Sequence, residues 1–160
     1  MITTSQPFDL EGVVQRVVPN VLETMLALKV EAEAGENALG GECVSGAIGI
    51  EGEGLSGVVY VHLTEALANR GTVAMLGLPE GETPDTGMVN DVTSELANMI
   101  GGGLKSALCD AGRACAMSTP SIVRGPAFAV ELPPDMQART FVFASRGERL
   151  AIEIHLKLTD

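Results

Sequence analysis

The final stretch of the chain, residues 150–158, alternates between apolar and other side chains. Every second position is leucine or isoleucine: Leu150, Ile152, Ile154, Leu156 and Leu158. The positions between them include Glu153, His155 and Lys157. Because successive side chains of a strand point to opposite faces, we expect a strand with one packed face and one wet face. Such a strand is typical of an antiparallel sheet that is covered on one side.

Apolar residues recur at helical spacing near the start of the chain and again after residue 64. The spacing predicts a helix over 8–28, in which Pro19 predicts a kink or a restart. Thr64 is expected to cap a second, shorter helix that runs to about Leu76 and ends at Gly77. The segment 83–86 opens a third and longer helix, which reaches about Asp110 and is closed by Gly112.

Shorter apolar segments bounded by turn residues predict the strands. They lie at 30–34, 43–50, 56–63, 116–123, 127–132, 140–144 and 150–158. The glycine-rich residues 51–54 predict a hairpin between two of them. The order is helix, strands, two helices, strands, which predicts an α+β fold: an antiparallel sheet packed on one side by long helices. A long helix followed by a strand pair occurs twice, which suggests duplicated helix-plus-hairpin units within a single domain over 1–160.

Composition narrows the possible partners and the compartment. The formal net charge of -11 argues against nucleic acid and anionic membranes, since both require clustered lysine and arginine. Neither a long apolar run nor a signal-peptide pattern is found, which favours a cytoplasmic protein. The three cysteines, Cys43, Cys109 and Cys115, show no CxxC spacing, so we expect reduced thiols and no zinc site.

Several catalytic motifs are missing from the sequence. It contains no HExxH, no GxxxxGK[ST] and no GxSxG. The two histidines, His62 and His155, fall in predicted strands and are interpreted as ordinary strand residues. A hydrolase with its own metal ion, or one with a serine triad, therefore has little support.

The long third helix carries an unusual polar side. At about 100° per residue, five residues fall together on it: Asp91, Glu95, Asn98, Gly102 and Lys105. The apolar side is predicted to hold Val92, Leu96, Met99, Ile100, Gly103, Leu104 and Ala107. Glu95 and Asn98 are three residues apart and therefore neighbours on the helix surface. An ExxN pair alone is common on solvated helices. Here it stands beside Gly102, where the backbone carries no side chain.

Three consecutive glycines, Gly101, Gly102 and Gly103, interrupt this helix. Each lowers helix propensity by roughly 0.8–1 kcal/mol relative to alanine. Tight packing on the sheet explains Gly103, whereas the close approach of a partner backbone explains the other two. The alternative is a weak helix that tolerates the glycines or breaks at Gly101.

Residues 95–105, Glu-Leu-Ala-Asn-Met-Ile-Gly-Gly-Gly-Leu-Lys, resemble the signature helix of the CheC/CheX/FliY chemotaxis phosphatases. In that family an ExxN motif precedes a glycine-containing stretch and often a lysine. Residues 118–125 resemble the following strand segment of the CheX branch, and residues 21–26 resemble its first helix. The resemblance extends from about residue 8 to 158. CheC-type members carry a second ExxN on the first helix, where this chain has Asn20 and Glu23 in reversed order, so one site per chain is expected.

The resemblance implies a phosphatase that acts on the aspartyl phosphate of a CheY-like response regulator. By resemblance, Glu95 bonds the active-site lysine of the receiver domain, and Asn98 orients the attacking water. Gly102 leaves room for the receiver's loops, and Asp91 and Lys105 are expected to contact the same partner. The phosphatase is expected to need no cofactor of its own, with Mg²⁺ supplied by the response regulator. The CheX branch also implies a homodimer joined through sheet edges, and the last strand is expected to provide such an edge.

Two other functions stay open at this point. The domain could be a non-catalytic adaptor that binds receivers or flagellar-switch components, although an adaptor would not need Asn98. It could instead be a sensory domain that binds a ligand, which would require an apolar pocket.

Overall fold

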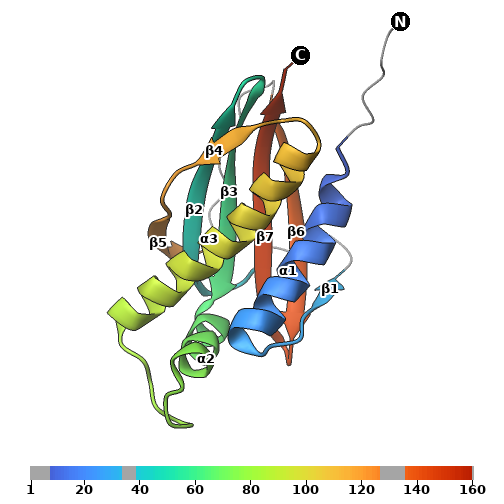
Figure 1. Ribbon diagram of the computed structural model, residues 1–160. Helices are drawn as coiled ribbons and strands as arrows, with labels where there is room; N and C mark the ends of the chain where they lie inside the picture. The colour runs from blue at the N-terminus through green and yellow to red at the C-terminus, as the bar shows by residue number, and fades with distance from the viewer. Residues whose placement is uncertain (1–7, 34–38, 127–135, 160) are drawn as a thin grey trace, which may run out of the picture.

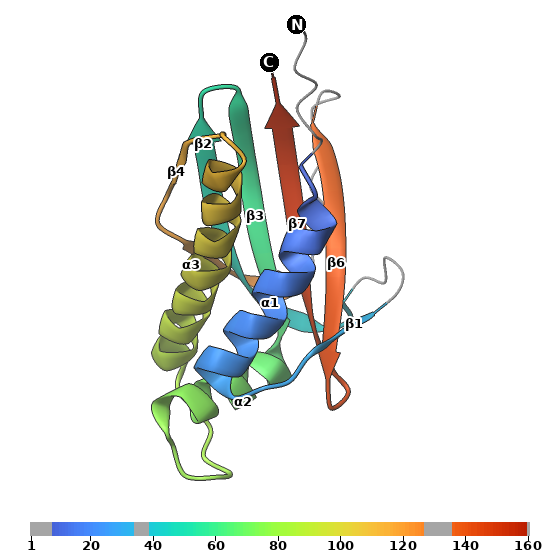
Figure 2. The same cartoon turned by 45° about the vertical axis from the view of Figure 1, so that its right-hand side comes forward.

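The computed structural model describes residues 8–33, 39–126 and 136–159. The strands in these residues join one sheet of seven strands, and every pairing is antiparallel. The three helices of the described residues all lie on the same face of the sheet (Figures 1 and 2). This arrangement confirms the α+β fold with one helix-covered face. None of these helices is long and apolar enough to cross a membrane.

Capping residues set the starts of the first two helices. Helix α1 (Leu10–Leu26) starts after Asp9, whose carboxylate accepts a hydrogen bond from the Gly12 N–H. It continues through Pro19 without a restart. Helix α2 (Glu65–Leu76) starts after Thr64 and ends at Gly77, whose positive φ of 64° suits glycine.

The sheet is built from two hairpins laid side by side. The strands are β1 (Glu31–Glu33), β2 (Glu42–Gly52), β3 (Leu55–Thr64), β4 (Cys115–Met117), β5 (Ser121–Pro126), β6 (Gln137–Ser145) and β7 (Glu148–Leu158). The β2–β3 and β6–β7 hairpins join through β3 and β7. Strand β1 pairs with β6 of the second hairpin, and β5 pairs with β2 of the first. Each helix-plus-hairpin unit therefore lends a strand to the other, and the predicted duplication is confirmed at the level of topology.

The strand predicted over 116–123 is in fact two strands, β4 and β5, which both pair with β2. The chain leaves the ladder after Ser118, whose N–H donates to the Gly49 carbonyl and whose Oγ accepts from the Gly49 N–H, both at 2.9 Å. Pro120 then has no N–H to continue the pairing. The predicted strand over 127–132 lies outside the described residues.

Two expectations about the last strand are wrong. Strand β7 lies between β3 and β6, so it cannot provide a free edge for dimerisation. Its second face is not wet either, since His155 is only 3% exposed. On this helix-free face Leu39, Cys43, Val142 and Ala151 form a small buried cluster beside the buried histidines. Alternation reveals which side chains share a face, but it does not reveal whether a polar face is covered.

Candidate active site on helix α3

Helix α3 (Thr86–Asp110) lies diagonally across the sheet with α1 at its side (Figure 1). Asp85 caps its start by accepting from the Met88 N–H at 2.9 Å. One side is buried against the sheet and α1, at Val89, Val92, Thr93, Leu96, Ala97, Ile100, Gly101, Leu104 and Leu108. The glycines do not break the helix, so the predicted boundaries hold and the alternative of a break at Gly101 is wrong.

The opposite side of α3 presents the predicted polar residues together. We call Asp91, Glu95, Asn98, Gly102 and Lys105 the α3 ridge. Asp91 and Glu95 are exposed, whereas the other three are half-buried. In the part of the chain that the structure describes, neither Glu95 nor Asn98 hydrogen-bonds or ion-pairs through its side chain. A carboxylate and a carboxamide thus stand side by side with their bonding capacity unused.

The three glycines occupy three different environments. A Cβ on Gly101 would stand 3.0 Å from Ile48 Cδ1, so Gly101 packs on the sheet. A Cβ on Gly103 would stand 2.6 Å from Val17 Cγ1, so Gly103 packs on α1 rather than on the sheet as predicted. Around Gly102, no atom of the described residues outside its own stretch of helix lies within 4 Å of the Cβ position. Only Gly102 therefore fits the explanation that a partner's backbone approaches the helix.

Met99 was predicted on the apolar side but is 44% exposed. Its position lies one turn after Glu95 and directly after Asn98, so its thioether adjoins the polar pair. The helical wheel placed it wrongly because Met99 stands near the border between the two sides of the helix. Met88 is also exposed, at 36%, two turns before Glu95. The α3 ridge therefore has apolar as well as polar side chains at its margin.

The neighbouring strand β5 is tied to the start of α3. The Arg124 guanidinium donates two hydrogen bonds to Asn90 Oδ1, at 3.0 and 2.8 Å, and one to the Thr86 carbonyl at 3.4 Å. These bonds fix the orientation of α3 relative to the sheet edge. Sequence analysis missed Arg124 as a positioning residue, because its partners are 34 and 38 residues away.

Helix α1 does not supply a second pair of this kind. Asn20 and Glu23 are both exposed on α1. Their order is reversed relative to Glu95 and Asn98, so the carboxamide precedes the carboxylate. One site per chain stays a prediction. Among the residues that the structure describes, no group of His, Cys, Asp and Glu has the arrangement of a metal site.

A buried polar network on the helix-free face was not predicted. Ser45 Oγ lies 2.7 Å from His62 Nδ1, and His62 Nε2 lies 3.1 Å from Glu153 Oε1. The other oxygen of Glu153 bonds His155, and Tyr60 stacks on His62. Burial lowers the pKa of His62, an effect that Glu153 opposes. Both histidines are thus strand residues, as predicted, but they are held in a network rather than solvated.

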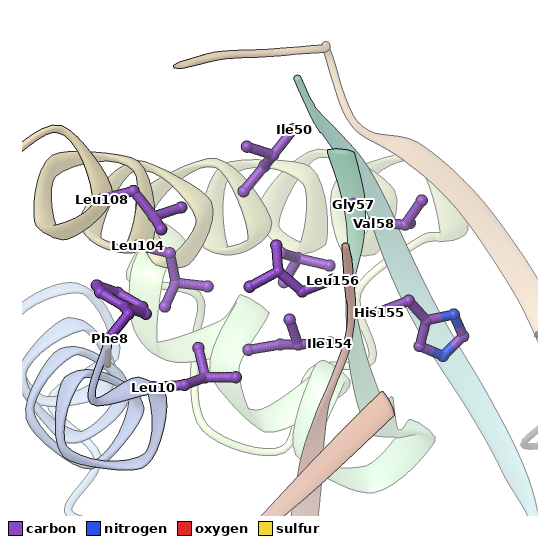
Figure 3. A pocket seen from close by; sticks show the side chains of 11 residues that line it. Phe8, Leu10, Ile50, Gly57, Val58, Leu104, Leu108, Ile154, His155 and Leu156 are labelled. Atoms are coloured by element: carbon purple, nitrogen blue, oxygen red, sulfur yellow. The ribbon is translucent and has the colours of Figure 1, made fainter. Parts of the chain in front are cut away.

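An apolar cavity lies between the start of α1, the end of α3 and the sheet (Figure 3). Phe8, Leu10, Leu104 and Leu108 line its helical wall, whereas the His155 ring points away on the other side of the sheet. Its volume is about 10 Å³, which is the space of a single water. This cavity offers no room for a ligand and gives no support to a sensory function.

Three comparisons with known proteins address the family. Residues 44–144 match the family model described as chemotaxis phosphatase CheX. A comparison with curated proteins finds no match. Among solved structures, chemotaxis protein CheX from Vibrio vulnificus is 26% identical, with a TM-score of 0.80 over 98% of this chain and 100% of that chain.

Two further structures share the fold. A CheC-like superfamily protein from Shewanella sp. PV-4 is 29% identical, with a TM-score of 0.79 over 95% of this chain and 99% of that one. The CheX of a CheX–CheY–BeF3–Mg²⁺ complex from Borrelia burgdorferi is 16% identical, with a TM-score of 0.72 over 94% and 99% of the two chains. At that identity the likeness concerns the fold alone.

Proposed function

This chain belongs to the CheX family of chemotaxis phosphatases, and we propose that it hydrolyses the aspartyl phosphate of a CheY-like response regulator. The observation that carries the proposal is the Glu95–Asn98 pair on the α3 ridge. The pair is engaged by no other described side chain and stands next to the open backbone of Gly102. The Borrelia relative was solved as a complex with CheY, which supports a receiver as the partner.

The proposed reaction requires little covalent chemistry from the phosphatase. Water attacks phosphorus, the bond between phosphorus and the aspartyl oxygen breaks, and inorganic phosphate leaves with the aspartate restored. Phosphoryl transfer depends on in-line positioning and on charge stabilisation. The divalent cation and the active-site lysine are proposed to come from the receiver.

Asn98 suits the role of orienting the water. Its carboxamide both donates and accepts hydrogen bonds, and it brings no negative charge toward the phosphoryl oxygens. Half-burial limits the rotamers that its side chain can adopt. The water would therefore be held by a group whose direction α3 sets.

Glu95 is proposed to pair with the receiver lysine and so to fix the register of the two proteins. Its carboxylate is exposed one turn before Asn98. Gly102 would admit the receiver's loops, and Asp91 and Lys105 would contact the partner at the two ends of the α3 ridge. We also propose that the chain works in the cytoplasm as a homodimer, joined through a sheet edge other than β7.

The test is phosphate release from a CheY-like receiver that has been charged with acetyl phosphate and Mg²⁺. Catalytic amounts of this protein should speed the release, and Asn98→Ala should abolish the effect. If wild type binds the phosphorylated receiver without speeding the release, the domain is an adaptor and the proposed catalysis is wrong.

A further inference from the structure

Two of the three cysteines meet at the C-terminal end of α3. Cys109 is exposed in the last turn of the helix, and Cys115 is half-buried at the start of β4. Cys115 packs against the core on the helix-facing side of β4, as does Met117, whose sulfur lies 3.4 Å from the Cβ position of Gly101. Two residues before Met117, Cys115 lies beside the last turns of α3, with Cys109 as its neighbouring thiol.

The turn between the two thiols is held by the backbone and by one arginine. Gly112, with a φ of 85°, donates its N–H to the Cys109 carbonyl at 3.0 Å. The Arg113 N–H donates to the Leu108 carbonyl at 2.8 Å. The Arg113 guanidinium also donates to the carbonyls of Gly54 and Thr159, each at 3.3 Å. These bonds hold the turn that joins the end of α3 to the start of β4.

The two sulfurs differ in their surroundings. Burial, followed by the neighbouring Cys109, raises the pKa of Cys115, whereas the Lys105 ammonium opposes this effect. Cys109 is exposed, so a soluble oxidant reaches it first. A thiolate is the attacking form in thiol oxidation. Exposure assigns Cys109 to the first step, and the raised pKa of the half-buried Cys115 suits the second.

We propose that Cys109 and Cys115 form a peroxide-reactive pair that closes to a reversible disulfide between α3 and β4. The Cys109 thiolate attacks one oxygen of hydrogen peroxide, the O–O bond breaks, and the departing hydroxide is protonated to water. This step leaves a sulfenic acid on Cys109. The Cys115 sulfur then attacks the Cys109 sulfur, the S–O bond breaks, and a second water leaves with the thiol proton. The two thiols lose two electrons, and peroxide is reduced to water.

Cys43 provides the internal control. It lies on the helix-free face of the sheet and is 2% exposed, in one buried cluster with Leu39, Val142 and Ala151. Burial also raises its pKa. The sheet separates Cys43 from the other two cysteines, so it stays a thiol. The inference does not depend on the proposed phosphatase activity, because it concerns only the thiols.

The experiment treats the folded, reduced full chain with a few-fold excess of hydrogen peroxide. The remaining thiols are then alkylated under denaturing conditions, and the protein is weighed intact and mapped by peptides. Wild type and Cys43→Ser should form the Cys109–Cys115 link within one chain and lose it with dithiothreitol. Peptide mapping of wild type identifies the linked pair even if a variant folds poorly.

Single variants test the order of the two steps. Cys115→Ser should accumulate a sulfenic acid on Cys109 that dimedone traps, whereas Cys109→Ser should stay reduced at the same dose. The proposal is overturned if wild type keeps all three thiols alkylatable, or if the link involves Cys43 or a second chain. Oxidation of Cys109→Ser at the wild-type rate overturns the assignment of Cys109 to the first step.

Discussion

Gly103 of α3 lies directly against Val17 of α1, and a Cβ on Gly103 would stand 2.6 Å from Val17 Cγ1 and 3.0 Å from Cγ2. Real Cβ atoms do not approach a neighbour that closely. Val17 is buried and β-branched, so its side chain has little freedom to turn aside. The close contact between the two long helices therefore requires glycine at position 103, while the next residue, Gly102, meets no such limit.

Gly103→Ala is expected to destabilise the fold by roughly 1–3 kcal/mol, the typical cost of overpacking a core. Gly102→Ala should instead raise the free energy of unfolding by about 1 kcal/mol, because alanine favours a helix and the space is open. Urea unfolding of both variants measures the difference. The double variant Val17→Ala with Gly103→Ala should recover part of the loss, and equal effects of the two single variants would contradict the packing argument.

Gly102→Ala also separates stability from function. If a receiver's backbone approaches α3 at Gly102, the added methyl should weaken binding of the phosphorylated receiver at least several-fold while the protein melts higher. Titration of the receiver against Gly102→Ala and wild type makes the comparison. Unchanged affinity would mean that no partner atom comes close to this position.

The boundaries of the helices could be predicted because local chemistry sets them. Thr64 and Gly77 enclose α2, and the long third helix ends at Asp110, as expected from Gly112. The Glu95–Asn98 pair was also predictable, since residues three apart on a helix must be neighbours. The single-domain prediction for 1–160 stays a prediction.

Contacts between distant segments could not be read from local patterns. The Gly103–Val17 contact joins residues 86 positions apart, and helical periodicity does not tell a sheet neighbour from a helix neighbour. The strand order could not be predicted either, because the alternation of side chains in β7 does not reveal that β3 and β6 lie on its two sides. The His62–Glu153 bond spans 91 residues and turned a predicted wet face into a partly buried one.

Stability is expected to fall in mild acid because of His62. Its folded pKa lies below the ordinary value of 6.5, so the unfolded chain binds the proton more readily. The contribution of neutral His62 to the free energy of unfolding is full above about pH 6.5. It is lost as the pH falls through the pKa that His62 has in the folded protein. The groups that face His62 are Ser45, Tyr60, Glu153 and His155.

Urea midpoints measured between about pH 7.5 and pH 5.5 should decrease for wild type and decrease less for His62→Gln. The comparison uses the slope of the urea midpoint against pH, so a constant loss of stability in His62→Gln does not affect it. Equal slopes for the two proteins would show that His62 does not cause the loss of stability in this pH range.

The proposed homodimer predicts a mass near twice the 16.6 kDa of the chain in light scattering at micromolar concentration. Among the described residues the edge strands β1, β4 and β5 are the candidate sites, since β7 is internal. A monomer mass for wild type across these concentrations contradicts the proposal.

Asn98→Ala is expected to lower receiver dephosphorylation by at least ~10²-fold, the scale of a mispositioned reactant. Binding of the phosphorylated receiver should change little, because the carboxamide holds the water rather than the partner. Asn20→Ala is the matched control, as Asn20 is an exposed asparagine on α1. Near-wild-type turnover by Asn98→Ala would remove Asn98 from the mechanism, and a large loss in Asn20→Ala would indicate a second site.

Glu95 gives the sharpest test of how the two proteins fit together. If its carboxylate meets the receiver lysine in a site partly closed to water, removing it should cost about 2–5 kcal/mol in the complex, mostly because the lysine stays buried and unpaired. Glu95→Ala should then weaken both binding and turnover, in contrast to Asn98→Ala. Glu95→Lys should be worse, since two ammonium groups would face each other.

The folded protein alone should be nearly indifferent to these changes, because Glu95 is exposed and hydrogen-bonds to no other side chain in the described part of the chain. Substitutions at such positions usually shift stability by under about 0.5 kcal/mol. Thermal melting and receiver titration should therefore be run on the same Glu95→Ala and Glu95→Lys samples, with Glu23→Ala on α1 as the matched control. Much lower melting temperatures would make Glu95 a structural residue. Normal melting together with wild-type affinity for the phosphorylated receiver would show that Glu95 forms no ion pair with the lysine, even if Asn98 proves essential.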